Sequence, residues 1–268
     1  MNWLSVKNQF EQWLRSEDYS DAFKKDVLSY LTRYVTEIME PFDVIAMFSK
    51  VNRGKRHLVL ALRTLFNFYE AVGVDNDYLD SLRKALPTVR CGLDLKVPEE
   101  AKIVESLKKL PNAPLKYQAL YNLLLDSGLR LVEAVELINS FEDADAVNGF
   151  YRSELAMFRG EKQAYYGHYS ECTLHLVKQV GEKLTPLTAS RYFRKMGYVL
   201  PKYLRKYAFD KMIELEVPES IADFIEGRVP TRIGAKHYLA LARQACKYYP
   251  RYSSHLQILR TQPHSSMR

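Results

Sequence analysis

The sequence predicts a mainly α-helical protein in two parts, with a small β-hairpin or sheet in the second part (an α+β fold). Apolar residues recur at three- and four-residue spacing along most of the 268 residues, which is the periodicity of amphipathic helices. Proline and glycine interrupt this periodicity at residues 87–98, and convincing strand patterns are confined to residues 141–170. We therefore expect a helical domain at residues 1–88, a linker at 89–96 and a mixed domain at 97–268.

The first domain is predicted to contain five helices, at residues 2–17, 21–39, 41–50, 52–73 and 76–86. The helix at 52–73 has the clearest apolar face, and Gly73 ends it. Its first turn is basic and carries Arg53, Lys55, Arg56 and His57. Positive charge at a helix start opposes the helix dipole. This turn is therefore either a contact to phosphate groups or an ordinary solvated helix start.

The second domain is predicted to contain several helices around one hairpin. Helices are expected at residues 97–110, on both sides of a break at 126–128, and at 187–196, 202–216, 218–226 and 232–248. A turn at 158–162 between two strand-like runs predicts the hairpin. Residues 173–183 fit either a strand or a helix. Residues 249–268 mix Pro, Ser, Arg and Leu, so we expect an extended tail with at most one short helix.

Composition excludes several classes of protein. The three cysteines (Cys91, Cys172 and Cys246) are far apart and form no CxxC pair, which favours reduced thiols in an intracellular protein. No apolar run approaches the length of about 18 residues that a membrane span needs, and we expect no signal peptide. Histidines at ligand spacing, carboxylate clusters and glycine-rich phosphate loops are not found in the sequence. We therefore expect no metal, no cofactor, no small-molecule substrate and no membrane contact.

Positive charge is concentrated near the C-terminus. The chain has a net charge of +7, and residues 200–268 hold 12 basic and 6 acidic residues, so this quarter contributes +6. Clustered positive charge suits a polyanion such as nucleic acid. A solvated basic tail would have the same composition, so charge alone leaves both interpretations open.

Four separated motifs carry residues suited to phosphate chemistry. The segment SGLRLVEAVEL contains Arg130, the predicted hairpin tip contains Lys162, and KYLR contains Lys202 and Arg205. A Gly-Arg pair at Arg228 is followed ten residues later by Tyr238. Arginine binds phosphate through two parallel hydrogen bonds, and a tyrosine can attack phosphorus and stay attached to it.

Each motif also has an ordinary explanation. Lys162 could serve solubility alone, because hairpin tips often carry lysine. Tyr238 has competitors in Tyr248, Tyr249 and Tyr252. The pair at 248 and 249 lies 20–21 residues beyond Arg228, twice the distance of Tyr238.

The order and spacing of these motifs resemble those of the tyrosine recombinase family of integrases. In that family the first box reads roughly TGLRxSE, the second HxxR and the third GH or GW, with the nucleophilic tyrosine about ten residues later. The resemblance covers essentially the whole chain. Lys202 stands where most members have His, and Arg228 stands where most have His or Trp. Integrases of spindle-shaped archaeal viruses and related archaeal plasmids are similar in both respects, so we expect a mobile genetic element of that type.

The resemblance implies a fold, a reaction and a role for each residue. The first domain would be a DNA-clamping core-binding domain and the second the catalytic domain. Tyr238 would attack the scissile phosphate, giving a 3′-phosphotyrosine and a free 5′-hydroxyl. The other implied roles are phosphate binding by Arg130, Arg205 and Arg228, protonation of the leaving oxygen by Lys162, phosphate contact or tyrosine deprotonation by Lys202, and orientation of Arg130 or Lys202 by Glu133.

The implied function is site-specific DNA recombination, in integration or excision. Its partner would be double-stranded DNA, bound by a homo-tetramer that is a monomer or dimer when free, in the cytoplasm at the nucleoid. Two alternatives are a monomeric topoisomerase of type IB, with similar Arg, Lys and Tyr chemistry, and a DNA-binding protein whose recombinase site has decayed. The separate helical domain and the long tail after Tyr238 favour the recombinase.

Overall fold

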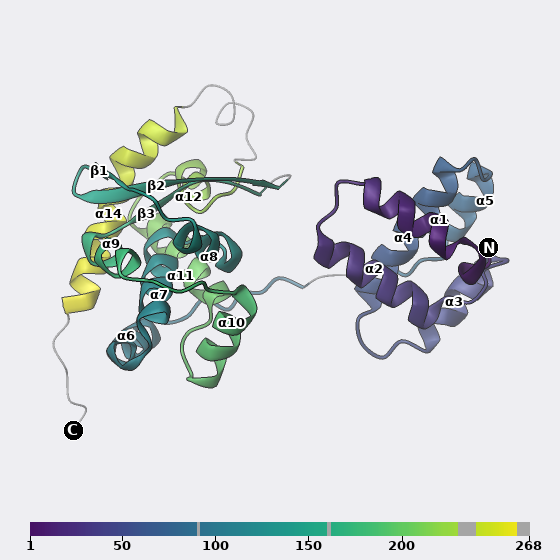
Figure 1. The fold of residues 1–268 in the computed structure, drawn as a ribbon, viewed down its shortest axis with the longest axis horizontal. Helices are drawn as coiled ribbons and strands as arrows, with labels where there is room; N and C mark the ends of the chain where they lie inside the picture. Colours follow the sequence, from purple (N-terminus) through teal and green to yellow (C-terminus); the bar gives the residue numbers. More distant parts are fainter. Residues whose placement is uncertain (90–91, 160–161, 230–239, 262–268) are drawn as a thin grey trace. The chain divides into compact units, whose positions relative to one another are not determined.

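The computed structural model describes residues 1–89, 92–159, 162–229 and 240–261. The chain divides into two compact units, Met1–Asp94 and Leu95–Arg268. Both units are largely helical, and the described strands form one three-stranded antiparallel sheet in the second unit (Figure 1). The predicted fold class, mainly α with a small sheet, is therefore confirmed.

The first unit is a set of helices around an aromatic and aliphatic core. Its helices are α1 (Trp3–Ser16), α2 (Asp21–Tyr34), α3 (Pro41–Ser49), α4 (Lys55–Ala71) and α5 (Asn76–Lys84). Phe10 is completely buried and packs edge-on against Trp3 and Phe68. The helix predicted at 21–39 ends at Tyr34, because the next residues pair with the N-terminus: the backbone amide of Trp3 donates to the Thr36 carbonyl (2.9 Å).

The second unit surrounds one buried helix. Its elements are α6 (Glu100–Lys109), a 3₁₀ turn η1 (Leu110–Asn112), α7 (Leu115–Ser127), α8 (Leu131–Asn139), β1 (Asp145–Val147), β2 (Phe150–Arg159), β3 (Lys162–Tyr169), α9 (Glu171–Lys178), α10 (Pro186–Lys195), α11 (Pro201–Glu214), α12 (Glu219–Ile225) and α14 (Leu241–Thr261). Helix α7 is buried without interruption from residue 119 to 127, and it packs against α8, α9, α11 and β3. The segment at 173–183, open between strand and helix, begins within helix α9.

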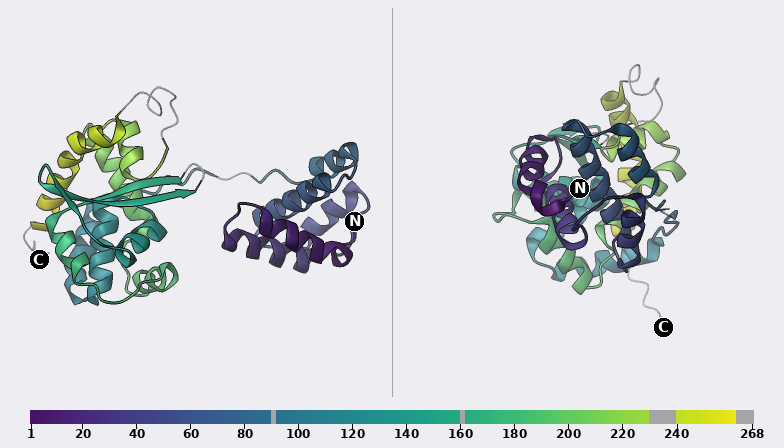
Figure 2. Two further views of the ribbon diagram at one scale, coloured as in Figure 1. Left: turned by 45° about the horizontal axis from the view of Figure 1, so that its top comes forward. Right: turned by 90° about the vertical axis from the view of Figure 1, so that its right-hand side faces the viewer.

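The sheet supplies the predicted hairpin. Strands β2 and β3 pair antiparallel from Tyr151 opposite Tyr169 to Arg159 opposite Lys162, and they form a ribbon whose hairpin end extends beyond the helices (Figures 1 and 2). The register shifts between Glu154 and Met157, where Ala156 has a positive φ of 46°. A bulge of this kind bends a strand and increases its twist.

Helix α14 corrects the prediction of an extended C-terminal tail. It is 21 residues long, and Pro250 lies inside it. Tyr249, Tyr252, Leu256 and Leu259 lie on its buried face in the core of the unit. Their burial outweighs the cost of about 3 kcal/mol that proline brings to a helix interior.

Polar contacts fix α14 to the end of α7. The hydroxyl groups of Tyr249 and Tyr252 donate to the backbone carbonyls of Asp126 (3.0 Å) and Leu125 (2.7 Å). These carbonyls belong to the last turn of α7, where backbone acceptors have no partner within the helix. Asp126 is completely buried and pairs with Arg260 of α14. Side chains of α14 thus donate hydrogen bonds to carbonyl groups in the last turn of α7.

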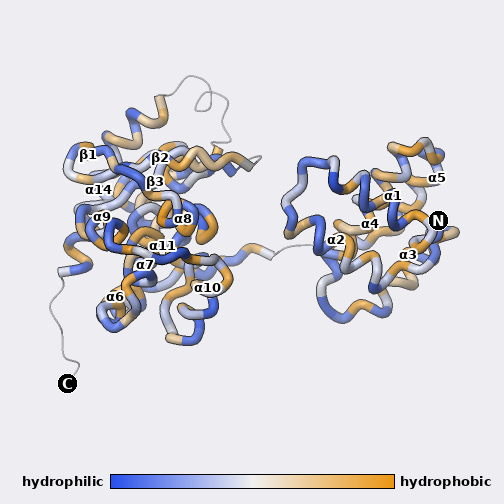
Figure 3. Tube along the Cα trace, in the orientation of Figure 1, coloured by the Kyte–Doolittle hydropathy of each residue, from blue (hydrophilic) through white to orange (hydrophobic). Residues whose placement is uncertain are grey.

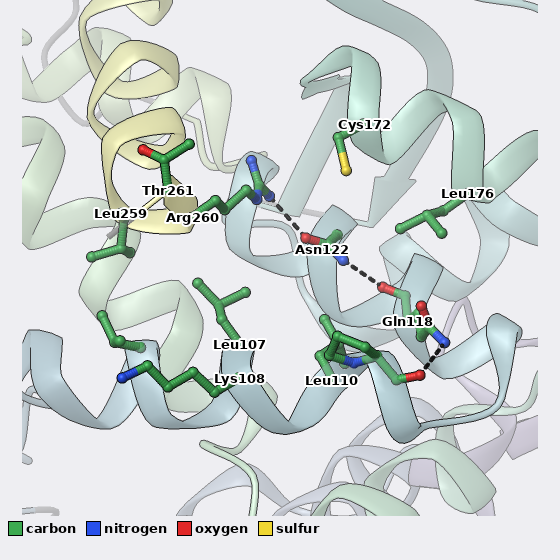
Figure 4. Close-up of a pocket in the computed structure, with 12 residues that line it drawn as sticks. Leu107, Lys108, Leu110, Gln118, Asn122, Cys172, Leu176, Leu259, Arg260 and Thr261 are labelled. Atoms are coloured by element: carbon green, nitrogen blue, oxygen red, sulfur yellow. Dashed lines mark hydrogen bonds between the residues drawn. The ribbon is translucent and has the colours of Figure 1, made fainter. Parts of the chain in front are cut away.

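Arg260 also lines a cavity of about 580 Å³ between α6, α7, α9 and α14 (Figure 4). Its Nη2 atom donates to Oδ1 of Asn122 (3.0 Å), so Arg260 contacts two residues of α7. The remaining lining is largely aliphatic, with Cys172 and Leu176 from α9.

Hydrophobic and hydrophilic residues alternate along most helices of both units, as expected for elements with one buried face (Figure 3). Among the described residues, every helix is too short or too polar to cross a membrane.

We predict that Arg260→Met lowers the free energy of unfolding by about 3 kcal/mol, because Asp126 then keeps a buried charge without its cationic partner. Urea denaturation followed by circular dichroism measures this change. The matched control is Lys109→Met, which removes an exposed ion pair with Glu105 and should cost below about 0.5 kcal/mol. Equal costs for the two variants would contradict the prediction.

Candidate active site

The junction between α7 and α8 places Arg130. Gly128 ends α7 in the left-handed conformation (φ +62°), and its amide donates to the Leu124 carbonyl (3.0 Å). Arg130 caps the start of α8. The carboxylate of Glu133 accepts hydrogen bonds from the backbone nitrogen of Arg130 (2.9 Å) and from its Nη1 atom (2.9 Å). A glutamate at this helix position commonly reaches back in this way, and it orients the arginine side chain.

Helix α11 brings Arg205 to the same place. Pro201 starts this helix, where its fixed φ and missing N–H are tolerated. The side chain of Arg205 is 9% exposed, and its Nη1 atom donates to the carbonyls of Gly128 (2.8 Å) and Glu226 (2.6 Å). One guanidinium group therefore connects the α7–α8 turn to the turn after α12.

The turn after α12 completes the group. Gly227 has a φ of +74°, and a Cβ atom there would lie 2.8 Å from the Cβ atom of Ala164 in β3. The Gly227 carbonyl accepts a hydrogen bond from Nη1 of Arg130 (2.8 Å). Nη2 of Arg228 lies 3.0 Å from Oε2 of Glu226, and its guanidinium carbon lies 4.8 Å from the Phe209 ring centroid. Only glycine suits both the backbone angle and the close approach to β3.

Three of the predicted site residues thus share one set of contacts. Arg130 from α8, Arg205 from α11 and Arg228 from the turn after α12 all contact residues 226–227. They are separated by 75 and 23 residues in the sequence. The fold therefore gathers these three arginines. Such a cluster can bind the non-bridging oxygens of a phosphate from several sides.

Burial shifts the acidity of the groups in this cluster. Burial lowers the pKa of Arg205 to about 10, so the guanidinium is still charged at neutral pH. Burial raises the pKa of Glu226 to about 8, against the opposite influence of Arg205 and Arg228. Burial also raises the pKa of Asp223, which lies 3.4 Å from Nη1 of Arg228. Within the described residues, Nη2 of Arg205 has no hydrogen-bond acceptor.

Lys202 lies one turn before Arg205 on α11. A cavity of about 480 Å³ is lined by both residues and by Arg130, together with Ser190 and Arg194 of α10. Lys202 therefore faces the same cavity as two of the arginines. Neither Lys162 nor Arg228 is among the residues that line it.

Lys162 is exposed at the start of β3, opposite Arg159. Among the described residues, its side chain makes no ion pair with the arginine cluster, but its strand contacts the turn that carries Arg228. Ala164, two residues later, packs against Gly227. Because a strand rises about 3.3 Å per residue, the Cα atom of Lys162 lies about 7 Å from that contact.

Tyr238 lies outside the described residues. That it lies near the arginines therefore stays a prediction. Two of its three competitors are buried in the core. Tyr249 and Tyr252 are completely buried and donate to carbonyls of α7, and burial raises the pKa of both hydroxyl groups. Neither can reach DNA without unfolding of α14. Tyr248 is partly exposed.

The basic turn of the first unit is exposed. Gly54 caps α4 in the left-handed conformation (φ +82°), and Arg53, Lys55, Arg56 and His57 surround it. The His57 ring stacks on Tyr30 at 5.3 Å and its Nδ1 atom lies 3.6 Å from Asp26. Exposure keeps these side chains accessible, as a contact to a phosphate backbone requires.

Sequence reasoning missed Glu226 and Asp223 as parts of the site. The carboxylate of Glu226 is completely buried, yet the motif around it reads only as Glu-Gly-Arg in the sequence. A glutamate beside a glycine is usually exposed, and nothing in the spacing reveals that this one is buried among arginines. Its position just before a Gly-Arg pair is the one available clue.

Comparison with known proteins agrees with this arrangement. The sequence model of the archaeal phage integrase family matches residues 95–255, which is more than half of the chain. No curated protein sequence is significantly similar to it.

Solved structures of lambda integrase show the same fold. A dimer of its residues 75–356 bound to a COC′ core site has a TM-score of 0.61 at 14% identity, covering 85% of this chain and 95% of that one. A second lambda integrase dimer bound to a COC′ core site has a TM-score of 0.62 at 18% identity, covering 90% and 78%. At such identities the likeness concerns the fold alone.

The resemblance to integrases of spindle-shaped viruses in particular is a prediction, since the matching family is described more broadly. The match to the family model spans the segment that holds Arg130, Lys162, Lys202, Arg205 and Arg228. The chain therefore belongs to the archaeal phage integrase family, and it is a site-specific DNA recombinase of the tyrosine type.

Proposed function

We propose that this recombinase cuts and rejoins DNA by attack of Tyr238 on a scissile phosphate held by Arg130, Arg205 and Arg228. The observation that carries the proposal is the meeting of these three arginines on residues 226–227. Arg205 supports it further, because its buried Nη2 atom lacks an acceptor among the described residues. A fixed donor without an acceptor is suited to a phosphate oxygen, since preorganised donors stabilise the charge that develops in the transition state.

The reaction exchanges one phosphodiester bond for another. The Tyr238 oxygen would form a bond to phosphorus while the bond from phosphorus to the 5′ oxygen breaks. The 3′ end then stays attached to the protein as a phosphotyrosine, and the 5′ oxygen leaves as a hydroxyl group. Attack by a 5′-hydroxyl of a second strand reverses the step and releases the tyrosine.

Two lysines complete the proposed chemistry. Lys162 would supply the proton that the leaving 5′ oxygen takes up, because it lies at an exposed strand end close to the Gly227 contact. Lys202 would contact the phosphate or accept the Tyr238 proton, because it lines the same cavity as Arg130 and Arg205. Glu133 would orient Arg130 through its two hydrogen bonds.

The wider assignments are part of the same proposal. Residues 1–88 would clamp the duplex, with Arg53, Lys55, Arg56 and His57 on its phosphates, and residues 97–268 would carry out catalysis. Double-stranded DNA would be bound by a homo-tetramer. The protein would act at the nucleoid in the cytoplasm.

We predict that Tyr238→Phe abolishes covalent capture of DNA. The measurement uses a nicked duplex carrying a candidate core site, in EDTA, and detects a protein–DNA band on a denaturing gel. Tyr248→Phe is the matched control and should form the band like the unchanged protein. A band that survives Tyr238→Phe would identify another nucleophile, and the absence of any band on any DNA would favour a binding protein without activity.

We predict that Lys162→Ala slows cleavage about 10²–10³-fold, because a general acid contributes on this scale. Replacing the bridging 5′ oxygen of the substrate with sulfur should restore the rate, since a thiol is far more acidic than an alcohol and leaves without a proton donor. Lys183→Ala, at an exposed lysine of the same unit, should cleave both substrates normally. If Lys162→Ala is equally slow on the sulfur substrate, Lys162 is not the acid.

We predict that Gly227→Ala lowers the cleavage rate more than tenfold, because its new methyl group pushes the turn away from Ala164 and displaces the carbonyl that holds Arg130. Gly197→Ala is the matched control: it has a similar φ of +70°, but no atom lies within 4 Å of the new methyl group. Both variants should lose about 1–2 kcal/mol of stability from backbone strain. Equal cleavage by the two variants would contradict this account of the turn.

A further inference from the structure

Glu226 has surroundings that differ from those of an ordinary structural carboxylate. It is completely buried, and Oε2 lies 3.5 Å from Nε of Arg205 and 3.0 Å from Nη2 of Arg228. Within the described residues, however, neither carboxylate oxygen has a partner in hydrogen-bond geometry. A buried ionised carboxylate without hydrogen bonds is costly, even beside positive charge.

The formal charges around Glu226 cancel when every group of the cluster is ionised. The charged groups that act on it are Arg130 of α8, Arg205 of α11, Arg228 of its own turn and Asp223 of α12, and Glu226 in turn acts on the buried hydroxyl of Tyr252 in α14. Glu133 is bonded to Arg130, so the cluster holds three guanidinium groups and three carboxyl groups. If all six are ionised, the formal charge is zero, and a phosphodiester would make it −1.

A phosphate and the Glu226 carboxylate therefore need the same donors. The Nη2 atom of Arg228 and the guanidinium of Arg205 cannot serve two anions at full strength. Repulsion between the anions favours the uncharged form of the carboxyl group, which is the one of the two anions that can take up a proton in this pH range.

We propose, on the basis of the function proposed above, that Glu226 is a positioning residue which competes with the scissile phosphate for Arg205 and Arg228, so that the DNA-bound site holds its carboxyl group in the protonated form. Below the pKa of the free protein the carboxyl is already neutral, and the arginines are available. Above that pKa it is ionised and must take up a proton when the phosphate binds.

Burial places the pKa of Glu226 at about 8 in the free protein, and the phosphate would raise it further in the complex. A group with a raised pKa in the complex favours binding below its free pKa and opposes it as the pH rises through that value. DNA affinity should therefore fall only about twofold between pH 7 and 8, because about half of the free carboxyl groups are ionised at pH 8. It should fall by about tenfold by pH 9, where roughly nine-tenths of the free carboxyl groups are ionised.

The test is the pH dependence of DNA affinity in the full chain carrying Tyr238→Phe, which prevents cleavage. Dissociation constants for a core-site duplex are measured by fluorescence anisotropy between pH 7 and 9 at constant salt. This range lies below the pKa of Arg205. The variants compared are Glu226→Gln, Glu226→Met and the control Glu219→Gln, an exposed glutamate of the same helix α12.

We expect Glu226→Gln to match the parent protein at pH 7 and to bind DNA about tenfold more tightly than the parent at pH 9. Glu219→Gln should keep the fall in affinity. If the Glu226 carboxylate served only to hold the fold, Glu226→Gln would bind DNA more weakly than the parent protein at every pH. Glu226→Met is a second uncharged side chain of similar length, and it is measured in the same way if the glutamine variant fails to fold.

Two results would overturn the inference. One is a parent protein whose DNA affinity does not change between pH 7 and 9. The other is a loss of DNA affinity with rising pH in Glu226→Gln and Glu226→Met that equals the loss in the parent protein. Both outcomes are independent of the proposed reaction, which the covalent trap with an unchanged Tyr238 tests separately. A covalent band together with an unchanged pH dependence in Glu226→Gln would reject the role of Glu226 and keep the recombination chemistry.

Discussion

The buried guanidinium of Arg205 is the contact on which the rest of the site depends. Its Nη1 atom is shared by the carbonyls of Gly128 and Glu226, so it joins the turn before α8 to the turn after α12. Arg130 leaves the first turn and Arg228 leaves the second. Arg205 therefore fixes the position of Arg130 relative to Arg228. Its hydrogen bonds are strong ones, because a charged donor binds the two carbonyls.

The same architecture explains why carboxylates are found among the arginines. Three guanidinium groups brought together without DNA would repel one another in a partly buried place, and Glu133, Asp223 and Glu226 offset that charge. Two of these carboxylates, Glu133 and Glu226, are almost or completely buried. An anion-binding site built in this way is stable when empty, at the expense of some affinity for the anion. The competition proposed for Glu226 follows from this balance.

Helix α14 stabilises the scaffold behind the site. Tyr249, Tyr252 and Arg260 bind the last turn of α7, and the left-handed turn at Gly128 follows that same helix end directly. The segment after the predicted nucleophile thus supports the turn from which Arg130 emerges. Arg228 precedes Tyr238 in the sequence and is linked to the α7–α8 turn through Glu226 and Arg205. Tyr249 follows Tyr238 and is linked to the end of α7 through the Asp126 carbonyl.

The sequence alone determined the local features of this protein. Helical periodicity located nearly all helices, the turn at 158–162 located the hairpin, and the motifs around Arg130, Arg205 and Arg228 singled out the three arginines that meet. The helices and the hairpin could be located because capping residues, periodicity and glycine turns act over a few residues. The same local reasoning expected an extended tail at residues 249–268, since burial of Tyr249 and Tyr252 against α7 is invisible in the sequence. Only the tertiary structure decided that Glu226 is enclosed by arginines from distant segments, because burial and charge contacts depend on which elements pack together.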